Sequence, residues 1–311
     1  MDDKQNEGTV VAFKGFDAEF KCRGYQFEVG KTYEHDGKVI ACESGFHSCE
    51  NPLDVLSYYS LCDSKFAVVE VSGELSRHDG DSKIASARLH IKAELSLPEF
   101  VKAAVAYVIA ACKIGDNVQS ASGHYAQLAA SGHYAQLAAS GHSAQLAASG
   151  DYAQLAASGH SAKLAASGHY AKLAASGDYA KLAASGDYAK LAASGHYAQL
   201  AASGHSANLA ASGDYAQLAA SGHSANLAAS GHSAKLAASG DYAQLAASGK
   251  DSIIASSSYN ATAKGAAGTW ISLAEFNREG KCIGFATGYI GQDGLLPDTY
   301  YRAQGGKLVQ S

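Results

Sequence analysis

The chain has 311 residues, of which 47% are hydrophobic and 17% are charged, and its formal net charge at pH 7 is −5. A charged fraction this low argues against an intrinsically disordered protein, and a slightly acidic chain lacks the positive charge that binds nucleic acid. Much of the apolar content is alanine from a repeat in the middle of the chain, so length alone does not give the number of domains.

The N-terminal part of the chain, residues 1–97, is predicted to be an α+β domain. A helix is expected from Pro52 to Tyr59, because Asn51 is a favourable N-cap and proline fits the first helical position. Runs rich in β-branched and aromatic residues predict strands at Val10–Lys14, Tyr25–Val29, Lys38–Cys42, Phe66–Val71 and Lys83–Ile91.

The most distinctive stretch of this domain is Ala41–Leu56. Cys42, His47 and Cys49 are possible zinc ligands, but the spacing Cys-x4-His-x-Cys matches no common zinc module. We therefore predict no metal ion and no cofactor. The candidates for lining a pocket are Ser44, Phe46 and His47.

The six cysteines have irregular spacing, and the first residues lack the basic and apolar regions of a secretory signal. We therefore expect reduced cysteines and a cytoplasmic protein, in the host cell if the protein is phage-encoded. The longest apolar run, Phe100–Cys112, is shorter than the roughly 18 residues that a membrane-spanning helix needs. No association with a membrane is expected.

Residues 98–114 are predicted to form a capping helix and the lead-in to the repeat. Pro98 begins this helix, which continues through the apolar segment Glu99–Ala111. An apolar helix directly before a stack of strands is expected to close the open end of its core and to shield its unpaired edge.

From Ser122 to Ala247 the chain consists of fourteen copies of a nine-residue unit, Ser-Gly-(His/Asp)-(Tyr/Ser)-Ala-(Gln/Lys/Asn)-Leu-Ala-Ala. Nine residues rotate an α-helix by about 900°, which would place successive leucines on opposite sides, so a helix is excluded. With a period of two, Ala-x-Leu-x-Ala forms one invariant face and the variable side chains form the other. The array predicts a parallel β-solenoid, residues 115–265, with one strand per unit.

The unit is compatible with two sizes of coil. A coil of two units, 18 residues, is favoured because leucine and alanine fill only a thin core, and a coil of three units, 27 residues, is the alternative. Glycine in the Ser-Gly corner is expected to supply the left-handed or otherwise unusual backbone angle that a tight turn needs. The incomplete units on either side of the array are interpreted as transitions into caps.

The third position of the unit carries His nine times and Asp five times. Stacked rows of these side chains would allow metal binding or a response to pH, but we favour hydrogen bonds that cap the turn. Free exchange of His for Asp argues against a dedicated metal site, and the unit lacks the aspartate pattern of calcium-binding nonapeptides, so no calcium is predicted. Asp is followed by Tyr in all five copies, and the sequence offers no reason for this.

The fourth position carries nine tyrosines, predicted to form outward-facing rows. Exposed tyrosines suit protein recognition, and stacking between coils is the alternative role. Five lysines at the sixth position balance the five aspartates, and this neutrality counts against DNA mimicry. The candidate binding surface consists of Tyr125, Tyr134, Tyr152, Tyr170, Tyr179, Tyr188, Tyr197, Tyr215 and Tyr242.

Residues 266–311 are predicted to form a β-meander. Its strands are expected at Thr269–Phe276, Cys282–Tyr289, Thr299–Ala303 and Lys307–Val309. The predicted fold is therefore mainly β: a nonapeptide-repeat parallel β-solenoid with an N-terminal α+β cap and a C-terminal β-meander cap.

Two resemblances concern the segments outside the array. The run Gly-Phe-His-x-Cys at 45–49 and the run Gly-Thr-Trp-Ile at 268–271 resemble an uncharacterised family of phages and gut bacteria in which such segments bracket nonapeptide arrays. This resemblance implies an origin among phage or mobile-element accessory genes.

The order of Phe13-Lys14-Gly15, residues 29–33, the Gly-Phe-x-Ser step at 45–48 and the strand Ala67–Val71 is similar to the layout of ADP-ribosyltransferases. This second resemblance implies an NAD-binding pocket beside the Gly-Phe-x-Ser step. The carboxylate that the family places later in the chain has no counterpart in Lys83–Leu89, and Glu94 lies out of place.

From these patterns we expect a non-enzymatic β-solenoid that serves as a scaffold or as a multivalent protein-binding surface, in an accessory or host-interaction factor of a phage or mobile element. Fourteen copies of one face raise the effective concentration for a repetitive partner. A protein partner is expected, nucleic acid and membranes are not, and the exposed faces allow a homodimer or homotrimer. The alternative is a degenerate or active ADP-ribosyltransferase-like domain displayed on a solenoid scaffold.

Overall fold

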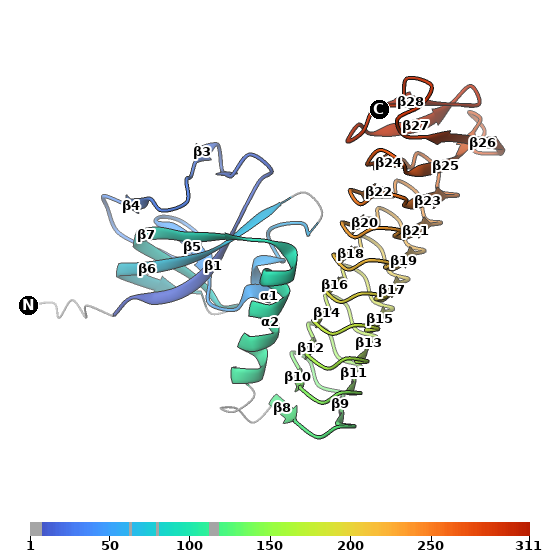
Figure 1. The fold of residues 1–311 in the computed structure, drawn as a ribbon. Coiled ribbons are helices and arrows are strands. Elements are labelled where there is room, and N and C mark those ends of the chain that lie inside the picture. Colours follow the sequence, from blue (N-terminus) through green and yellow to red (C-terminus); the bar gives the residue numbers. More distant parts are fainter. Residues whose placement is uncertain (1–7, 62–63, 79–80, 112–117) are drawn as a thin grey trace, which may run out of the picture. The chain divides into compact units, whose positions relative to one another are not determined.

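The computed structural model describes residues 8–61, 64–78, 81–111 and 118–311 (Figure 1). The chain divides into two compact units, residues 1–107 and 108–311. Within the described residues the fold is mainly β, with 28 strands and two helices, and the parallel β-solenoid predicted from the repeat is confirmed.

The N-terminal unit is built on one antiparallel sheet that closes on itself. Its strand order is β4-β7-β5-β1-β6, and β6 also pairs with β7. Aromatic and aliphatic side chains such as Phe16, Val69 and Ile91 fill the interior. The strands are β1 (Val10–Phe16), β4 (Thr32–Glu34), β5 (Phe46–Cys49), β6 (Lys65–Arg77) and β7 (Lys83–Leu95), and a small hairpin consists of β2 (Lys21–Cys22) and β3 (Tyr25–Gln26).

Four of the five strands predicted in this unit overlap observed strands, and the fifth prediction, Lys38–Cys42, is wrong. The chain turns there instead: Ile40 bridges to Ser44, and Cys42 has a φ of +69°. The strands β4 and β5 escaped prediction because each is short and lacks a regular alternation of apolar and polar residues.

The first helix, α1 (Pro52–Val55), begins where the sequence predicts and ends earlier than Tyr59. The side chain of Asn51 accepts a hydrogen bond from the backbone N–H of Leu53 at 3.0 Å, so the expected N-cap is confirmed. The chain after α1 continues in turns stabilised by backbone bonds, such as that from Tyr58 N–H to the Val55 carbonyl.

The second helix, α2 (Leu97–Ala111), begins after Ser96, and the carboxylate of Glu99 reaches back to cap this end, as in one half of a capping box. The backbone N–H and the hydroxyl of Ser96 both donate to the Glu99 carboxylate, at 2.8 and 2.6 Å, and these bonds lower the pKa of Glu99. The ring of Phe100 stacks on Phe66 of β6 with centroids 4.3 Å apart, so the first half of α2 packs on the N-terminal sheet. That α2 closes the open end of the solenoid core stays a prediction.

The solenoid has two sheets whose parallel strands alternate along the chain. The nine parallel strands of the eleven-stranded sheet are β8 (Val118–Ala121), β10 (Gln136–Ala139), β12 (Gln154–Ala157), β14 (Lys172–Ala175), β16 (Lys190–Ala193), β18 (Asn208–Ala211), β20 (Asn226–Ala229), β22 (Gln244–Ala247) and β24 (Thr262–Gly265). Those of the ten-stranded sheet are β9 (Gln127–Ala130), β11 (Gln145–Ala148), β13 (Lys163–Ala166), β15 (Lys181–Ala184), β17 (Gln199–Ala202), β19 (Gln217–Ala220), β21 (Lys235–Ala238), β23 (Ile253–Ser256) and β25 (Trp270–Phe276).

The coil contains two units. Leu137 pairs with Leu155, and Leu146 with Leu164, in each case 18 residues along the chain. The three-unit coil is therefore ruled out. The incomplete units are themselves part of the solenoid. β8, β23 and β24 pair in register with repeat strands, β25 pairs with β23, and together they bring the solenoid to nine coils.

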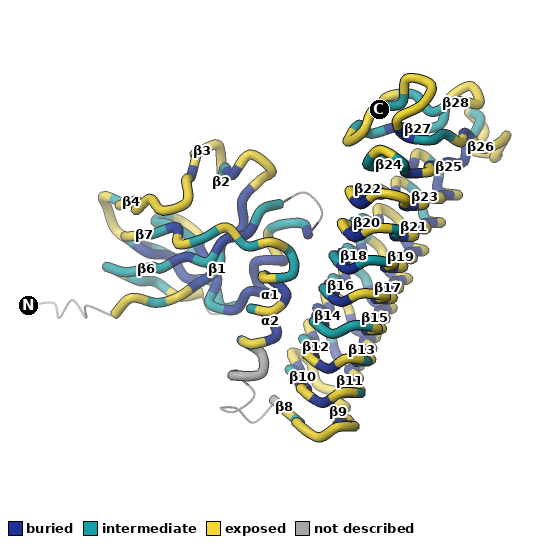
Figure 2. Tube along the Cα trace, in the orientation of Figure 1, coloured by how far each residue is buried: buried dark blue, intermediate teal, exposed yellow. Residues whose placement is uncertain are grey.

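The invariant face of the unit lies in the core, as predicted. In β11 and the residue before it, Ala144, Leu146 and Ala148 are buried, whereas Gln145 and Ala147 are exposed. The same alternation of buried and exposed positions recurs along the ten-stranded sheet (Figure 2).

The glycine of the Ser-Gly corner has a different role from the one expected. It is not left-handed; the residues with positive φ are those at the fourth position, for example Tyr170 at +57°. Glycine is needed because the corners stack closely: a Cβ on Gly159 would overlap the carbonyl oxygen of Gly141 in the preceding coil. The constraint is therefore steric contact between coils.

The four predicted C-terminal strands are present, but they form two hairpins, one on each sheet. β25 pairs with β26 (Cys282–Tyr289) on the ten-stranded sheet, and β27 (Tyr301–Gln304) pairs with β24 and with β28 (Lys307–Gln310) on the eleven-stranded sheet. The connection between the hairpins crosses from one sheet to the other, so each edge is covered. Ile290 and Tyr301 are buried at this end of the core.

Candidate functional sites

The tyrosines of the fourth position form two separate ladders. The rings of Tyr134, Tyr152, Tyr170 and Tyr188 stack at centroid distances of 4.9–5.0 Å on one corner of the coil. Those of Tyr179, Tyr197 and Tyr215 stack at 4.9–5.0 Å on the other corner. Tyr125 and Tyr242 lie outside these ladders, in contact with His124 and Tyr259.

Both roles weighed for the tyrosines are compatible with this geometry. Stacking covers the ring faces, yet the residues remain exposed, from 42% at Tyr152 to 72% at Tyr125. Each ladder therefore presents ring edges and phenol hydroxyls at a regular interval of about 5 Å on a hydrogen-bonded frame.

The third-position side chains bond the backbone of the adjacent coil. Asp151 accepts from the N–H of His169 at 2.8 Å, and Nδ1 of His169 accepts from the N–H of Asp187 at 3.1 Å. His and Asp exchange freely because each supplies an acceptor atom at the same place. The Nδ1 atom of His169 also lies 3.6 Å from the Asp187 carboxylate.

The constant pairing of Asp with Tyr has a physical explanation in these rows. Where the fourth position is Ser, the third is always His, so every unit contributes at least one aromatic ring to its corner. One column runs from His142 through His160, at 5.0 Å, to Tyr179, at 5.2 Å. An Asp-Ser unit would interrupt the stack.

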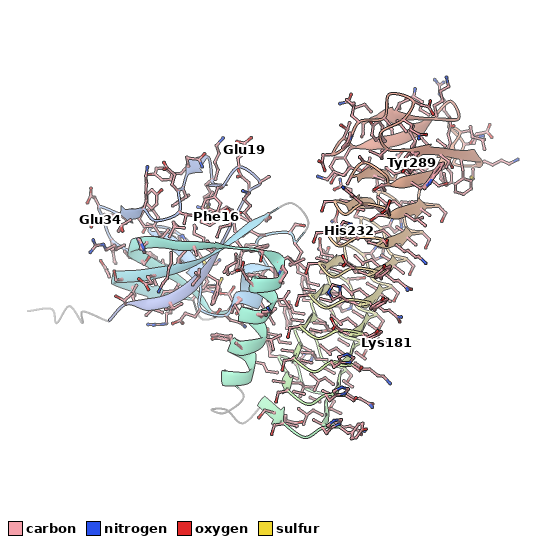
Figure 3. The ribbon with its side chains drawn as sticks, viewed as in Figure 1. Phe16, Glu19, Glu34, Lys181, His232 and Tyr289 are labelled. Atoms are coloured by element: carbon pink, nitrogen blue, oxygen red, sulfur yellow. The ribbon has the colours of Figure 1, made fainter. Side chains whose placement is uncertain are left out.

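The outer face of the ten-stranded sheet carries a second extended surface, which the sequence did not single out. A row of Gln and Lys side chains runs beside a row of alanines, and Lys181 points outward from this face (Figure 3). Two grooves of about 1310 and 1060 Å³ follow the alanine row. The face ends on exposed apolar side chains, among them Trp270 and Phe285.

The N-terminal unit contains a cavity of about 700 Å³, and all three predicted pocket residues, Ser44, Phe46 and His47, line it. The Ser44 hydroxyl donates to the Lys38 carbonyl at 2.6 Å. The Nε2 atom of His47 accepts from the Cys42 N–H at 2.9 Å. These bonds hold the two side chains without forming a nucleophile–base pair.

The pKa of His47 is lowered. Burial disfavours the imidazolium, and the nearby charges of Lys14 and Lys83 act in the same direction. His47 is therefore a neutral acceptor at the cavity wall over most of the physiological pH range.

Lys14 is the main cavity residue that the sequence analysis passed over as a site. It is 5% exposed, and its Nζ atom donates to the His47 carbonyl at 2.7 Å and lies 3.7 Å from Cys22 Sγ. Burial lowers the pKa of Lys14. The signal in the sequence is a lysine at an inward position of β1, between Ala12 and Phe16.

Cys22 accepts a second hydrogen bond in this cavity, from the Tyr59 hydroxyl at 3.0 Å. The Tyr59 ring is held in place because it lies over Gly15, where a Cβ would collide with it. None of the described cysteines, Cys22, Cys42, Cys49 and Cys282, forms a disulfide bond, and Cys62 and Cys112 lie outside the described residues.

The titratable side chains around the cavity bear on the metal ligands and the carboxylate considered from the sequence. Within the described ranges, no three His, Cys, Asp or Glu side chains converge as metal ligands. Glu94 pairs with Lys65 at 3.3 Å, on the β6–β7 hairpin, and does not line the cavity.

Comparisons with known proteins cover only the N-terminal unit. Residues 10–103 match a family described as a domain of unknown function, DUF7666. No curated protein and no solved structure shows a significant match. The matched range corresponds to the closed sheet and the start of α2, and it does not reach the solenoid.

Neither helix of the described chain combines the length and the apolar character that crossing a bilayer requires.

Proposed function

We propose that the protein is a non-enzymatic scaffold whose solenoid binds a protein partner through its tyrosine ladders. The observation that carries this proposal is the constant 4.9–5.0 Å spacing of half-exposed tyrosine rings on a rigid frame. Rigid amphipathic rings provide contact area at a low cost in conformational entropy. A partner with a repeated motif would also gain avidity from successive coils.

The wider context of this proposal comes from the resemblance to phage and gut-bacterial proteins. We expect an accessory or host-interaction factor that acts in the cytoplasm of the host cell. A multivalent surface suits such a role because affinity is set by the number of coils and not by one precisely shaped pocket.

The test uses a substitution that the array itself contains. Serine occupies the ladder position at Ser206 and Ser224, in each case after a histidine. The triple variant Tyr134→Ser, Tyr170→Ser, Tyr197→Ser, in which each tyrosine also follows a histidine, is therefore expected to keep the fold. The matched control, Lys163→Gln with Lys181→Gln, alters the sheet face and leaves the ladders intact. Proteins captured from a host lysate by the immobilised chains are compared by quantitative mass spectrometry.

A partner of the ladders is retained by the original chain and by the lysine control, and its recovery falls at least tenfold with the tyrosine variant. Deletion of residues 158–229, eight whole units, should weaken the capture of the same protein. Identical sets of captured proteins from all four chains would contradict the proposal.

A further inference from the structure

A buried lysine, Lys14, lies in the wall of the cavity of the N-terminal unit. Lys14 Nζ contacts a carbonyl, a thiol and, at 5.5 and 5.6 Å, the ring centroids of Phe27 and Phe16. No carboxylate pairs with it among the described residues. A buried ammonium is costly unless it is paired, so an anion beside Lys14 would stabilise the charged form that burial disfavours.

Two other cationic side chains on the cavity wall would add to the attraction for an anion. Arg23 and Lys83 line the cavity together with Lys14, and Glu43 is the one carboxylate among the lining residues.

The shape and the rings of the cavity indicate what else the ligand carries. About 700 Å³ is the size of a small-molecule site. Six lining residues are aromatic: Phe13, Tyr25, Phe27, Phe46, Tyr58 and Tyr59. Lys83 Nζ lies 3.9 Å from the centroid of the Tyr58 ring, so the cavity wall has a cationic group directly beside an aromatic ring.

We propose that this cavity binds a small organic anion with a planar ring, whose charged group lies against Lys14 and Lys83. A nucleoside monophosphate and an aromatic carboxylate share this chemistry. The site is independent of the tyrosine ladders, so its failure would leave the proposed function of the solenoid untouched.

The test compares charged ligands with neutral analogues of the same shape. Isothermal titration calorimetry on the full-length protein measures adenosine monophosphate against adenosine, and benzoate against benzamide. At least one anion is expected to bind ten or more times tighter than its neutral analogue, and the pair that responds distinguishes a phosphate from a carboxylate. Equal affinity within both pairs, or no saturable binding of either anion at millimolar concentrations, would overturn the proposal.

Substitutions then locate the ligand. Lys83→Gln should weaken binding of the responding anion at least fivefold, whereas Lys92→Gln, on the same strand but paired with Glu70 at 2.6 Å, should leave it unchanged. Lys14→Met should abolish binding and raise the melting temperature of the ligand-free N-terminal unit, because it removes the buried charge. An unchanged affinity in Lys83→Gln would contradict the assignment even if Lys14→Met fails to fold.

Discussion

The corner glycines are the residues on which the stacking of coils most directly depends. Gly159→Ala is expected to destabilise the solenoid by about 1–3 kcal/mol, because the added methyl group collides with backbone that cannot move without parting the coils. Thermal or denaturant unfolding followed by circular dichroism measures the change. Gly132→Ala is the control, since a Cβ there meets no atom of the described residues within 4 Å. Equal losses for the two variants would be inconsistent with the steric explanation.

The stacking of aromatic rings between coils predicts the effect of substitutions at His142 and Ser143. His142→Asp creates an Asp-Ser unit and removes the ring that stacks at 4.9 and 5.0 Å on His124 and His160, so a loss of about 1–2 kcal/mol is expected. The double variant His142→Asp, Ser143→Tyr restores an Asp-Tyr unit and should recover most of that loss. Denaturant unfolding at pH 7 measures both variants, and a double variant no more stable than the single one would refute the role of continuous stacking.

His47 makes the N-terminal unit sensitive to pH. Its pKa is lowered in the folded state by burial and by two lysines, so the unfolded chain takes up a proton more readily. The contribution to stability is complete above about pH 6.5 and is lost as the pH falls toward the folded-state pKa. Hydrogen exchange of peptides from residues 10–95 should show faster opening at pH 5.5 than at pH 7.5. His47→Gln should reduce this difference, and an unaltered pH dependence in that variant would contradict the assignment.

At the scale of a strand, the 18-residue coil determines which side chains are neighbours. Lys181 lies beside Lys163 on the ten-stranded sheet, so Lys181→Glu should form an attractive pair and stabilise the solenoid by about 0.2–1 kcal/mol at low salt. Lys235→Glu serves as the matched control, because its neighbours are Gln217 and Ile253. Urea unfolding compares the two. An equal response from both would mean that residues 18 apart are not adjacent.

The strands are short, and most of their stability comes from neighbours in the stack. Four residues per strand bury one leucine and one alanine, and isolated strands of this length are not stable. The C-terminal hairpins are therefore structural elements in their own right, because they continue both sheets and cover the edges at that end.

Over the whole solenoid, each coil contacts only its two neighbours, so the position of a substitution along the stack matters. Leu182→Ala in a central coil should cost about 2–4 kcal/mol, since the leucine is 2% exposed and has a leucine on either side. Leu128→Ala in an end coil, where the leucine is only partly buried, should cost less than about half of that. Denaturant unfolding of the two variants provides the comparison, and equal costs would exclude nearest-neighbour stacking.

Much of the solenoid could be predicted from the sequence because a strict repeat leaves few geometrical solutions. A leucine every nine residues is incompatible with a helix, and the invariant Ala-x-Leu-x-Ala positions are the buried ones in Ala144–Ala148. The N-terminal unit was less predictable. Short irregular strands such as β4 and β5 carry little local signal and exist because longer strands pair with them.

The candidate sites, like the fold, could be predicted from the sequence only in part. The sequence placed tyrosines on the outside and put Ser44, Phe46 and His47 in one pocket. It did not place Lys14 there, because a lysine in a strand is usually solvated and only the closing of the sheet buries this one.

The sequence by itself determined the extended rungs, their invariant inward face and the presence of C-terminal strands, since these follow from periodicity within a single segment. The tertiary structure alone decided that two units make a coil, that glycine serves the contact between coils, and that Lys14 meets Cys22 and His47 across a cavity. These three features depend on contacts between residues that are distant in the chain. The conformational preferences of individual residues do not determine such contacts.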